Sequence, residues 1–506
     1  MPYLLGLDIG TTSTIGILID AEGATLAVES RPATLHSDHA GWAEEETGEW
    51  WGNVGEIARA LLSRSGLSPR DITGVGITGM LPTVILVDRD GRALRRSIQQ
   101  NDARATAELE SFRAGMQEDE FLALTGTGYS QQLVGPKLMW LRRREPEIWR
   151  QTQCVLGASD YITAALTGTR QVEHNWALES GLVNISTGAY DERLLALADL
   201  DPRFLAPIRR SHEVVGGITA AAADHTGLAP GTPVVAGCAD HVASAFVCGA
   251  SRNGDLVVKF GGAGDILLSS DRPVADRRLF IDHHIVPGLW FPNGCMAASG
   301  SLLNWVVRNW GSGEAEAARK AGVGAHQWLD GLAARVPATS PLLMLPYVLG
   351  EKTPLMDPYA RGTLVGLGLN HGMPEIWRAA LEAVVFGFRH HTEVLGEAGL
   401  EVTRIFAADG GARSDLWLQI TADALGRPVT RIDRHPGSCL GAAFVAGIGI
   451  GAIADWTAIS KYVRQGRTFE PEPAAASALD RKYALWRDTY RRLKDLFPSL
   501  AALEGA

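Results

Sequence analysis

A short apolar segment that turns back on itself at the N-terminus is the feature that most constrains the fold. Residues 3–9 are largely apolar, Gly10-Thr11-Thr12-Ser13 follow, and residues 14–20 are largely apolar again. Glycine lets backbone N–H groups approach an anion, threonine hydroxyls donate to phosphate oxygens, and an aspartate at a strand end can hold hydrated Mg²⁺. The pattern predicts a phosphate-binding β-hairpin with Asp8 beside the metal. The alternative is an ordinary hairpin whose polar residues satisfy their own turn.

Two further glycine turns follow apolar segments. Residues 256–260 lead into Gly261-Gly262-Ala263-Gly264 and a second apolar segment, which repeats the first design. Residues 405–408 lead through Asp409 into Gly410-Gly411-Ala412 and a helix that starts near Asp415. A strand, a glycine pair and a helix start are typical of nucleotide sites. The three turns favour two related half-molecules that hold a nucleotide between them.

The order of the elements predicts an α/β protein. Strand-like residues 75–78 and 84–88 precede a helix over residues 375–394, and apolar positions spaced by three and four predict a packing helix over residues 479–497. The 506 residues exceed what one hydrophobic core usually serves. We expect two domains, 1–248 and 249–506, with the boundary where the Ala-rich segment ends and the second hairpin begins.

Charge and cysteine content exclude several classes of protein. The net charge of −10, without a large basic segment, argues against nucleic acid as a partner. The five cysteines are scattered and odd in number, so neither a disulfide framework nor a zinc site is indicated. No uninterrupted apolar segment reaches the roughly 18 residues of a spanning helix. We therefore expect a cytoplasmic protein with no membrane partner.

The candidate catalytic residue is Asp240. It follows the apolar residues 233–236 and the small residues 237–239, and His241 comes directly after it. Phosphoryl transfer needs a carboxylate that orients the attacking hydroxyl and accepts its proton, together with Mg²⁺ and donors for the phosphate oxygens. We predict that Asp240 is this general base. The alternative is that it only caps a helix, and both roles are compatible.

Several longer motifs resemble the FGGY carbohydrate kinases, and nearly the whole chain takes part in the resemblance. Residues 362–367 with 375–382 resemble the second signature of that family, and residues 345–347 with 350–354 resemble its Leu-Pro-Tyr and Gly-Glu-Arg-Thr-Pro segment. Within the family, residues 41–44 with 49–51, and residues 136–141, look most like xylulose kinases.

The resemblance implies two ribonuclease-H-like lobes of the actin and hexokinase type with a central nucleotide and sugar cleft. It implies ATP and Mg²⁺ as cosubstrates and transfer of the γ-phosphoryl group to a hydroxyl of a small sugar or polyol. Asp240 then matches the base and Asp8 the metal-associated aspartate. The residues that match the phosphate loops and the adenosine segment are Gly10, Thr11, Thr12, Ser13, Gly261, Gly262, Gly264, Gly410, Gly411 and Ala412. Asp102 and Arg104 match residues near the sugar.

The departures from the family pattern fall at the substrate and phosphate positions. Met80-Leu81-Pro82-Thr83 stand where xylulose kinases have Gln-Met-His-Gly, so a histidine is missing from the sugar pocket. His241 stands where that group has asparagine, and we expect it to supply the lost imidazole from the other wall. Gly262 replaces a usual threonine and Asp409 replaces a glycine. These changes affect the identity of the sugar more than the fold.

The sequence therefore predicts an ATP-dependent kinase for a small sugar, closest to a pentulose such as xylulose, whose lobes close when the sugar binds. A kinase for a tetrose, a polyol or an autoinducer is an alternative within the family. A nucleotide-binding and sugar-binding sensor or ATPase without sugar turnover is an alternative of another class. A homodimer is compatible with the sequence.

Overall fold

The computed structural model describes residues 2–434 and 437–504, which form two compact units. The first unit comprises Met1–Ser251, Asp271–Phe291 and His435–Val463, and the second comprises Arg252–Ser270, Pro292–Arg434 and Arg464–Ala506. The chain thus leaves the first unit and returns to it twice. The sequence suggested a single boundary between residues 248 and 249. The structure divides the chain differently, because residues 271–291 and 435–463 belong with the first unit.

The first unit is built on a mixed sheet of seven strands. The strand order is β14-β15-β6-β1-β2-β3, and the short β16 also pairs with β6. The bounds are β1 Tyr3–Ile9, β2 Ser13–Asp20, β3 Thr25–Pro32, β6 Ile72–Gly79, β14 Val214–Gly217, β15 Pro233–Val235 and β16 Cys238–Ala239. Strands β1 and β2 form the predicted antiparallel hairpin, whereas β1, β15 and β16 each run parallel to β6.

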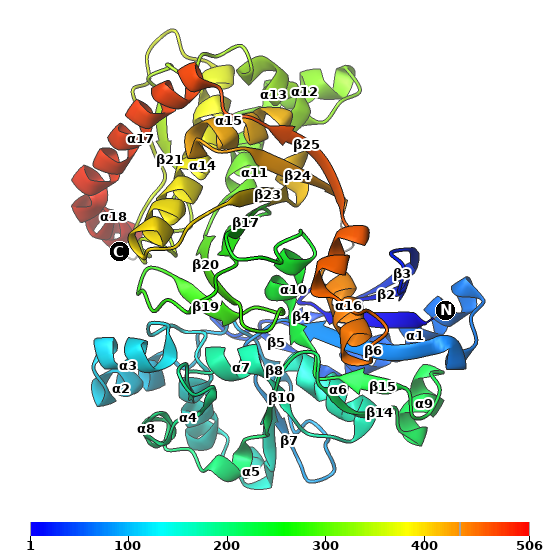
Figure 1. Ribbon diagram of the computed structural model, residues 1–506. Coiled ribbons are helices and arrows are strands. Elements are labelled where there is room, and N and C mark those ends of the chain that lie inside the picture. The colour runs from blue at the N-terminus through cyan, green and yellow to red at the C-terminus, as the bar shows by residue number, and fades with distance from the viewer. Residues whose placement is uncertain (1, 435–436, 505–506) are drawn as a thin grey trace. The chain divides into compact units, whose positions relative to one another are not determined.

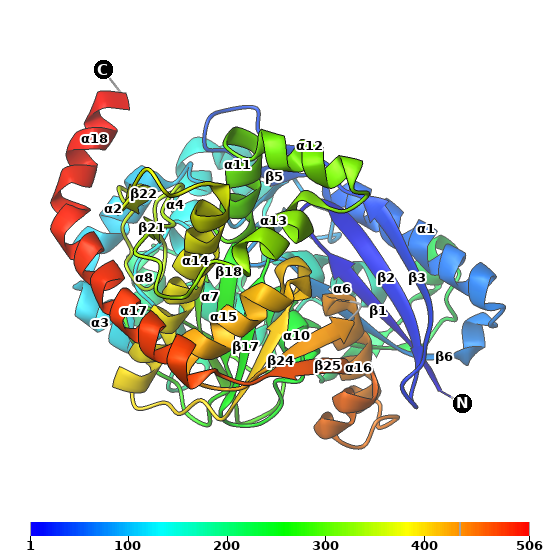
Figure 2. The same ribbon diagram turned by 90° about the horizontal axis from the view of Figure 1, so that it is seen from above.

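Helices cover both faces of this sheet, and glycines in the strands set how closely they approach. A Cβ on Gly6 of β1 would lie 2.0 Å from a backbone oxygen of α16 (Ser438–Gly449), so this helix touches the strand backbone. Gly16 of β2 is paired with Leu7 and therefore faces the other side, where it meets Ile57 and Leu61 of α1 (Thr47–Ser65). Figure 1 shows α16 beside β6, and Figure 2 shows α1 along β2 and β3.

The second unit repeats the hairpin-plus-parallel-strand design. Its strands follow the order β20-β18-β17-β23-β24-β25, with bounds β17 Asp255–Phe260, β18 Gly264–Leu268, β20 Trp290–Met296, β23 Arg404–Ala408, β24 Val429–Arg434 and β25 Arg464–Phe469. Strand β17 pairs antiparallel with β18 and parallel with β23, as β1 does with β2 and β6. The predicted repeat of the first hairpin is confirmed.

Long helices complete the second unit. The helix predicted over 375–394 is α14 (Met373–Glu397), and the predicted C-terminal helix is α17 (Pro473–Leu493), which ends before α18 (Phe497–Glu504). Trp486 of α17 is buried and donates to the backbone oxygen of Met344. All five cysteines are free thiols. Among residues 2–434 and 437–504, no helix is long and apolar enough to cross a membrane.

Candidate active site

Asp8 and Asp240 lie at the same edge of the first sheet. Strands β1 and β16 flank β6 in parallel, with Asp8 and Cys238 paired to Thr78 from its two sides. Two strand spacings separate Asp8 from Cys238, which is about 10 Å, and Asp240 follows two residues later. Parallel strands present their carboxyl ends at one edge, where ligands of open α/β sheets bind. The sheet thus brings together the two acids that the sequence singled out.

Asp8 is largely buried, with 9% of its surface exposed. Its Oδ2 accepts a 2.6 Å hydrogen bond from the Ser438 hydroxyl at the first residue of α16. A carboxylate at a strand end, with hydroxyl groups nearby, is a donor set that suits Mg²⁺, which keeps several waters and takes one or two carboxylates from protein. Asp8 with Ser438 beside it could therefore hold that ion.

The first glycine turn joins β1 to β2 and comprises Gly10, Thr11 and Thr12 before Ser13 begins β2. The Gly10 amide donates to the Ser13 carbonyl over 3.1 Å, and the Thr11 hydroxyl contacts the Met80 sulfur at 3.3 Å. Thr12 is exposed. The turn therefore has one hydroxyl against the protein and one toward solvent.

Met80, Leu81 and Pro82 continue from the end of β6 and are all buried. The Met80 amide donates to the carbonyl of Ile9 over 3.0 Å, which holds this segment against the first turn. The next residue, Thr83, accepts a hydrogen bond at its carbonyl from the buried indole of Trp176. The three residues expected to contact the substrate thus form a buried apolar segment beside the first glycine turn, and they offer no polar side-chain group apart from a thioether.

Asp240 is the first residue of α10 (Asp240–Phe246), and its side chain is 35% exposed. It does not cap this helix, because Ala239 occupies the cap position. Its Oδ1 accepts the His241 amide N–H over 2.6 Å and lies 3.4 Å from His241 Nδ1. The carboxylate is therefore held at one oxygen and remains accessible to solvent.

His241 connects Asp240 to two acids from other elements. Its Nε2 lies 2.9 Å from Asp282 Oδ2 on β19 (Phe280–His283) and 4.0 Å from Glu179 Oε1 on α7 (His174–Glu179). Ligand atoms of Glu179, His241 and Asp282 all lie within 4.8 Å of one another, a spacing that a metal site also has. The 2.9 Å contact is that of a charge-assisted hydrogen bond, so we interpret these residues as a hydrogen-bonded cluster.

Asp102 and Arg104 form a buried ion pair. Two oxygens of Asp102 accept from Arg104 Nε and Nη2 at 2.8 and 2.7 Å, and the guanidinium carbon lies 3.7 Å from the centre of the Trp42 ring. Their side chains are 0% and 1% exposed. Arg104 also forms an ion pair with Glu44 at 2.7 Å, so the pair holds this part of the first unit together.

Lys137, in the segment that resembles xylulose kinases, is fully buried on α4 (Val134–Arg144). Its ammonium group donates to the carbonyls of Gln99 and Gln100 at 2.8 and 3.3 Å. Burial lowers the pKa of Lys137 to about 7, and the negative charge of Asp102 offsets part of this shift. The lysine thus fixes the segment that precedes Asp102.

The glycine turns of the second unit have the local geometry that the sequence predicts. Gly261 and Gly262 lie between β17 and β18, with their carbonyls accepting from Gly300, Ser299 and Ser301, and Gly264 begins β18. Gly410, Gly411 and Ala412 form a 3₁₀ turn that leads to α15 (Asp415–Leu425). Asp409 has φ of 72°, a conformation that favours the glycine it replaces.

Sequence reasoning missed Glu179, Asp282 and Ser438. Asp282 is the penultimate residue of β19, as Asp8 is of β1, so the same signal was present there. Glu179 at the end of a short helix and Ser438 at the start of another have no local pattern that points to the site. Only the fold brings them to Asp240 and Asp8.

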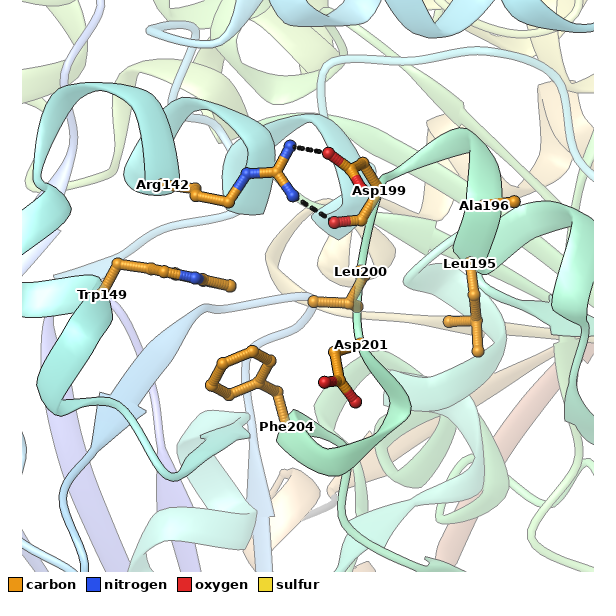
Figure 3. Close-up of a pocket in the computed structure, with 8 residues that line it drawn as sticks. All are labelled: Arg142, Trp149, Leu195, Ala196, Asp199, Leu200, Asp201 and Phe204. Carbon is orange, nitrogen blue, oxygen red and sulfur yellow. Dashed lines mark hydrogen bonds and ion pairs between the residues drawn. The ribbon is translucent and has the colours of Figure 1, made fainter.

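Two cavities of the first unit are separate from these residues. One of about 360 Å³ is lined by Trp149, Phe204 and Leu200, with Arg142 paired to Asp199 at its rim (Figure 3). The other, of about 370 Å³, is lined by His174 and His283 among others. None of the expected site residues lines either cavity.

Comparison with known proteins shows which family shares these features. The model of the FGGY family of carbohydrate kinases matches in its N-terminal domain at residues 3–247 and in its C-terminal domain at residues 263–450. A xylulose kinase of Bacillus subtilis (strain 168) is 27% identical, with 99% of each chain covered. A gluconokinase of Bacillus licheniformis is 29% identical over 99% of this chain and 96% of its own. The crystal structure of xylulose kinase from Rhodospirillum rubrum is 46% identical with a TM-score of 0.92, covering 98% of this chain and 99% of that one.

Proposed function

Because this chain belongs to the FGGY family of carbohydrate kinases and is an ATP-dependent sugar kinase, we propose that its substrate is a pentulose, xylulose or a close relative. The observation that carries the proposal is the placement of Asp240 and Asp8 at one edge of the sheet beside the Gly10–Thr12 turn. The 46% identity to the Rhodospirillum rubrum xylulose kinase supports the choice of sugar.

In the proposed mechanism, Asp240 accepts the proton of the attacking hydroxyl. The exposed oxygen of its carboxylate can reach a hydroxyl at the sheet edge, whereas Asp8 is too buried to do so. Asp8 would hold Mg²⁺, and that ion would supply the positive charge that neutralises the phosphate oxygens.

The phosphate groups are assigned to backbone and hydroxyl donors. Gly10, Thr11, Thr12 and Ser13 form one phosphate loop, while Gly261, Gly262 and Gly264 form the other. Gly410, Gly411 and Ala412 contact the adenosine. We assign these roles from the resemblance to the family's phosphate loops and adenosine segment, and the turns support them because glycine keeps side chains away from an approaching anion.

The sugar contacts Met80, Leu81, Pro82 and His241 in this proposal. Asp102 and Arg104 support that wall from behind, since their side chains are buried. With this apolar segment and one imidazole, selectivity depends on few polar groups, each of which contributes a few kcal/mol when its partner hydroxyl is present.

A panel of sugars tests the substrate. We expect coupled ADP-release assays to give the highest kcat/KM with a xylulose, and lower values with a tetrose, a simple polyol, gluconate and a linear autoinducer. A higher kcat/KM for any of the latter would replace xylulose as the substrate. Equal ATP hydrolysis with and without every sugar would instead favour the sensor or ATPase alternative.

Asp240→Asn tests the base. We expect kcat to fall by about 10²–10⁴-fold, as for loss of a general base, with KM for ATP nearly unchanged. Asp480→Asn, at an exposed acid of α17, is the matched control. An Asp240→Asn variant with wild-type kcat would remove Asp240 from the mechanism.

A further inference from the structure

The imidazole of His241 has a carboxylate oxygen at each of its two ring nitrogens. Nε2 lies 2.9 Å from Asp282 Oδ2, and Nδ1 lies 3.4 Å from Asp240 Oδ1. A neutral imidazole has one N–H and one lone pair, so one of the two carboxylates would face a lone pair. Only the imidazolium donates from both nitrogens. The geometry therefore favours a protonated ring.

The charges around the ring favour the same state. Among the residues that the structure describes, the charged groups that face it are Asp240 on its own helix, Asp282 on β19 and Glu179 on α7. Burial acts to lower the pKa of His241, but the charge of Asp282 and the hydrogen bonds to Asp240 and Asp282 raise it well above the usual value. Burial, and then the charge of Asp282, raise the pKa of Glu179 well above its usual value.

A protonated His241 fixes the orientation of Asp240. The Oδ1 atom accepts from both the backbone N–H and the ring of His241, whereas Oδ2 has no hydrogen-bond partner among residues 2–434 and 437–504. One carboxylate oxygen is thus anchored and the other is left to accept a proton. A carboxylate held in this way does not have to reorient when the substrate binds.

We propose that Asp282 is a positioning residue that keeps His241 as an imidazolium, and that this imidazolium holds Asp240 with Oδ2 directed to the acceptor hydroxyl. The inference rests on the proposed role of Asp240 as the base. During transfer the hydroxyl proton passes to Asp240 Oδ2, the hydroxyl oxygen bonds to the γ-phosphorus, and the bond from that phosphorus to the β–γ bridging oxygen breaks to leave ADP. His241 keeps its proton throughout.

The protonation state can be measured without turnover. In protein labelled with ¹⁵N-histidine, the His241 signals are assigned by their loss in His241→Asn, with His326→Asn as a control at an exposed histidine of α13 (Ala325–Ala333). We expect both ring nitrogens of His241 to be protonated at pH 7.5. In Asp282→Asn the ring is expected to titrate near the usual pKa of about 6.5, and Asp282→Glu is expected to keep it protonated.

A neutral His241 at pH 7.5 in the wild type would overturn the proposal, whether or not Asp282→Asn folds. An unchanged titration in folded Asp282→Asn would do so as well. Because these signals need no substrate, they decide the proposal even if the sugar panel refutes the proposed function.

Kinetics separate positioning from a merely structural role. We expect kcat of the wild type to be constant between about pH 7 and 8.5. In Asp282→Asn, kcat is expected to fall roughly 20-fold across that interval, because a ring with a pKa of about 6.5 loses most of its remaining protonated form there. KM for ATP is expected to stay unchanged. A uniform loss of kcat at every pH would mean that Asp282 acts only through stability, which contradicts the proposal.

Discussion

At the residue scale, burial of an ionisable group couples the stability of the fold to pH. Glu45 has no exposed surface and accepts from the Trp50 indole over 2.9 Å. Burial raises the pKa of Glu45 to about 7, partly offset by that hydrogen bond. In the unfolded chain the same group titrates near its ordinary value of about 4.3. Between about pH 4.3 and pH 7, the native state therefore keeps a proton that the unfolded state has lost.

Glu45→Gln is expected to change how stability depends on pH. Stability of the wild type falls as pH rises from about 4.5 to 7, because the unfolded chain ionises more easily there. Glutamine keeps an acceptor for Trp50 and does not ionise. We expect the variant to gain up to about 3 kcal/mol relative to wild type on going from pH 5 to pH 8. Urea unfolding at both pH values checks this, and an equal difference at the two would contradict it.

Gly262 stands where the family usually has a threonine, and restoring that threonine tests whether the hydroxyl matters. Nothing lies within 4 Å of a Cβ built there, so a side chain fits without strain. Gly262→Thr adds a hydroxyl donor to the proposed phosphate loop, and a hydrogen bond to a charged group contributes about 1.5–3 kcal/mol. We expect KM for ATP to fall roughly tenfold or more. Gly262→Ala, which fills the space without a donor, should leave KM unchanged, and equal effects of both variants would refute the role of the hydroxyl.

At the element scale, close approach of a helix to strand backbones decides the architecture of the first unit. Gly6 and Gly76 are paired across β1 and β6, and α16 lies directly on them. The same helix begins with Ser438, which bonds to Asp8. Packing of α16 therefore sets the position of a site residue.

Gly76→Ala should disturb both stability and activity. Its Cβ would lie 2.0 Å from the backbone oxygen of Ala442, so α16 must move. We expect a loss of about 1–3 kcal/mol or more, seen as a lower Tm, together with a lower kcat as Ser438 shifts from Asp8. Gly313→Ala, on α12 (Ser312–Lys320) with nothing within 4 Å, is the matched control and should be neutral or slightly stabilising. Equal Tm changes in the two variants would contradict the packing argument.

Local pattern predicted the hairpins but not the partner of α16. Residues 3–20 and 256–268 each form a strand, a glycine turn and a second strand. Neighbouring residues alone indicate a hairpin in both cases. By contrast, α16 is buried along nearly its whole length and apolar on every side, so no stripe indicates the sheet that it covers. The cluster of Glu179, His241 and Asp282 was not predicted, for a related reason. Its members come from three elements, and charge pairing between them depends on the fold.

At the scale of the whole molecule, the first unit is discontinuous in sequence. It needs residues 271–291, which carry Asp282, and residues 435–463, which carry α16. A single cut after residue 248, natural from composition, would remove both. The family motifs could not reveal this, because they mark local segments and not the contacts between them.

A fragment of residues 1–248 should therefore fail to fold stably. Without α16 the faces of β1 and β6 that carry Gly6 and Gly76 are uncovered. We expect the fragment to bind a hydrophobic dye and to be degraded rapidly in limited proteolysis. Joining residues 435–463 through a flexible linker should restore part of the protection. Sharp, cooperative unfolding of fragment 1–248 alone would contradict this expectation.

The late position of α16 in the chain also bears on synthesis. When β1 and β6 leave the ribosome, the helix that covers them is not yet translated, and residues 252–434 must be added first. At about 5–20 residues per second, this takes roughly 10–40 s. During that interval we expect the nascent strands to expose apolar surface and to be prone to aggregation until α16 has emerged.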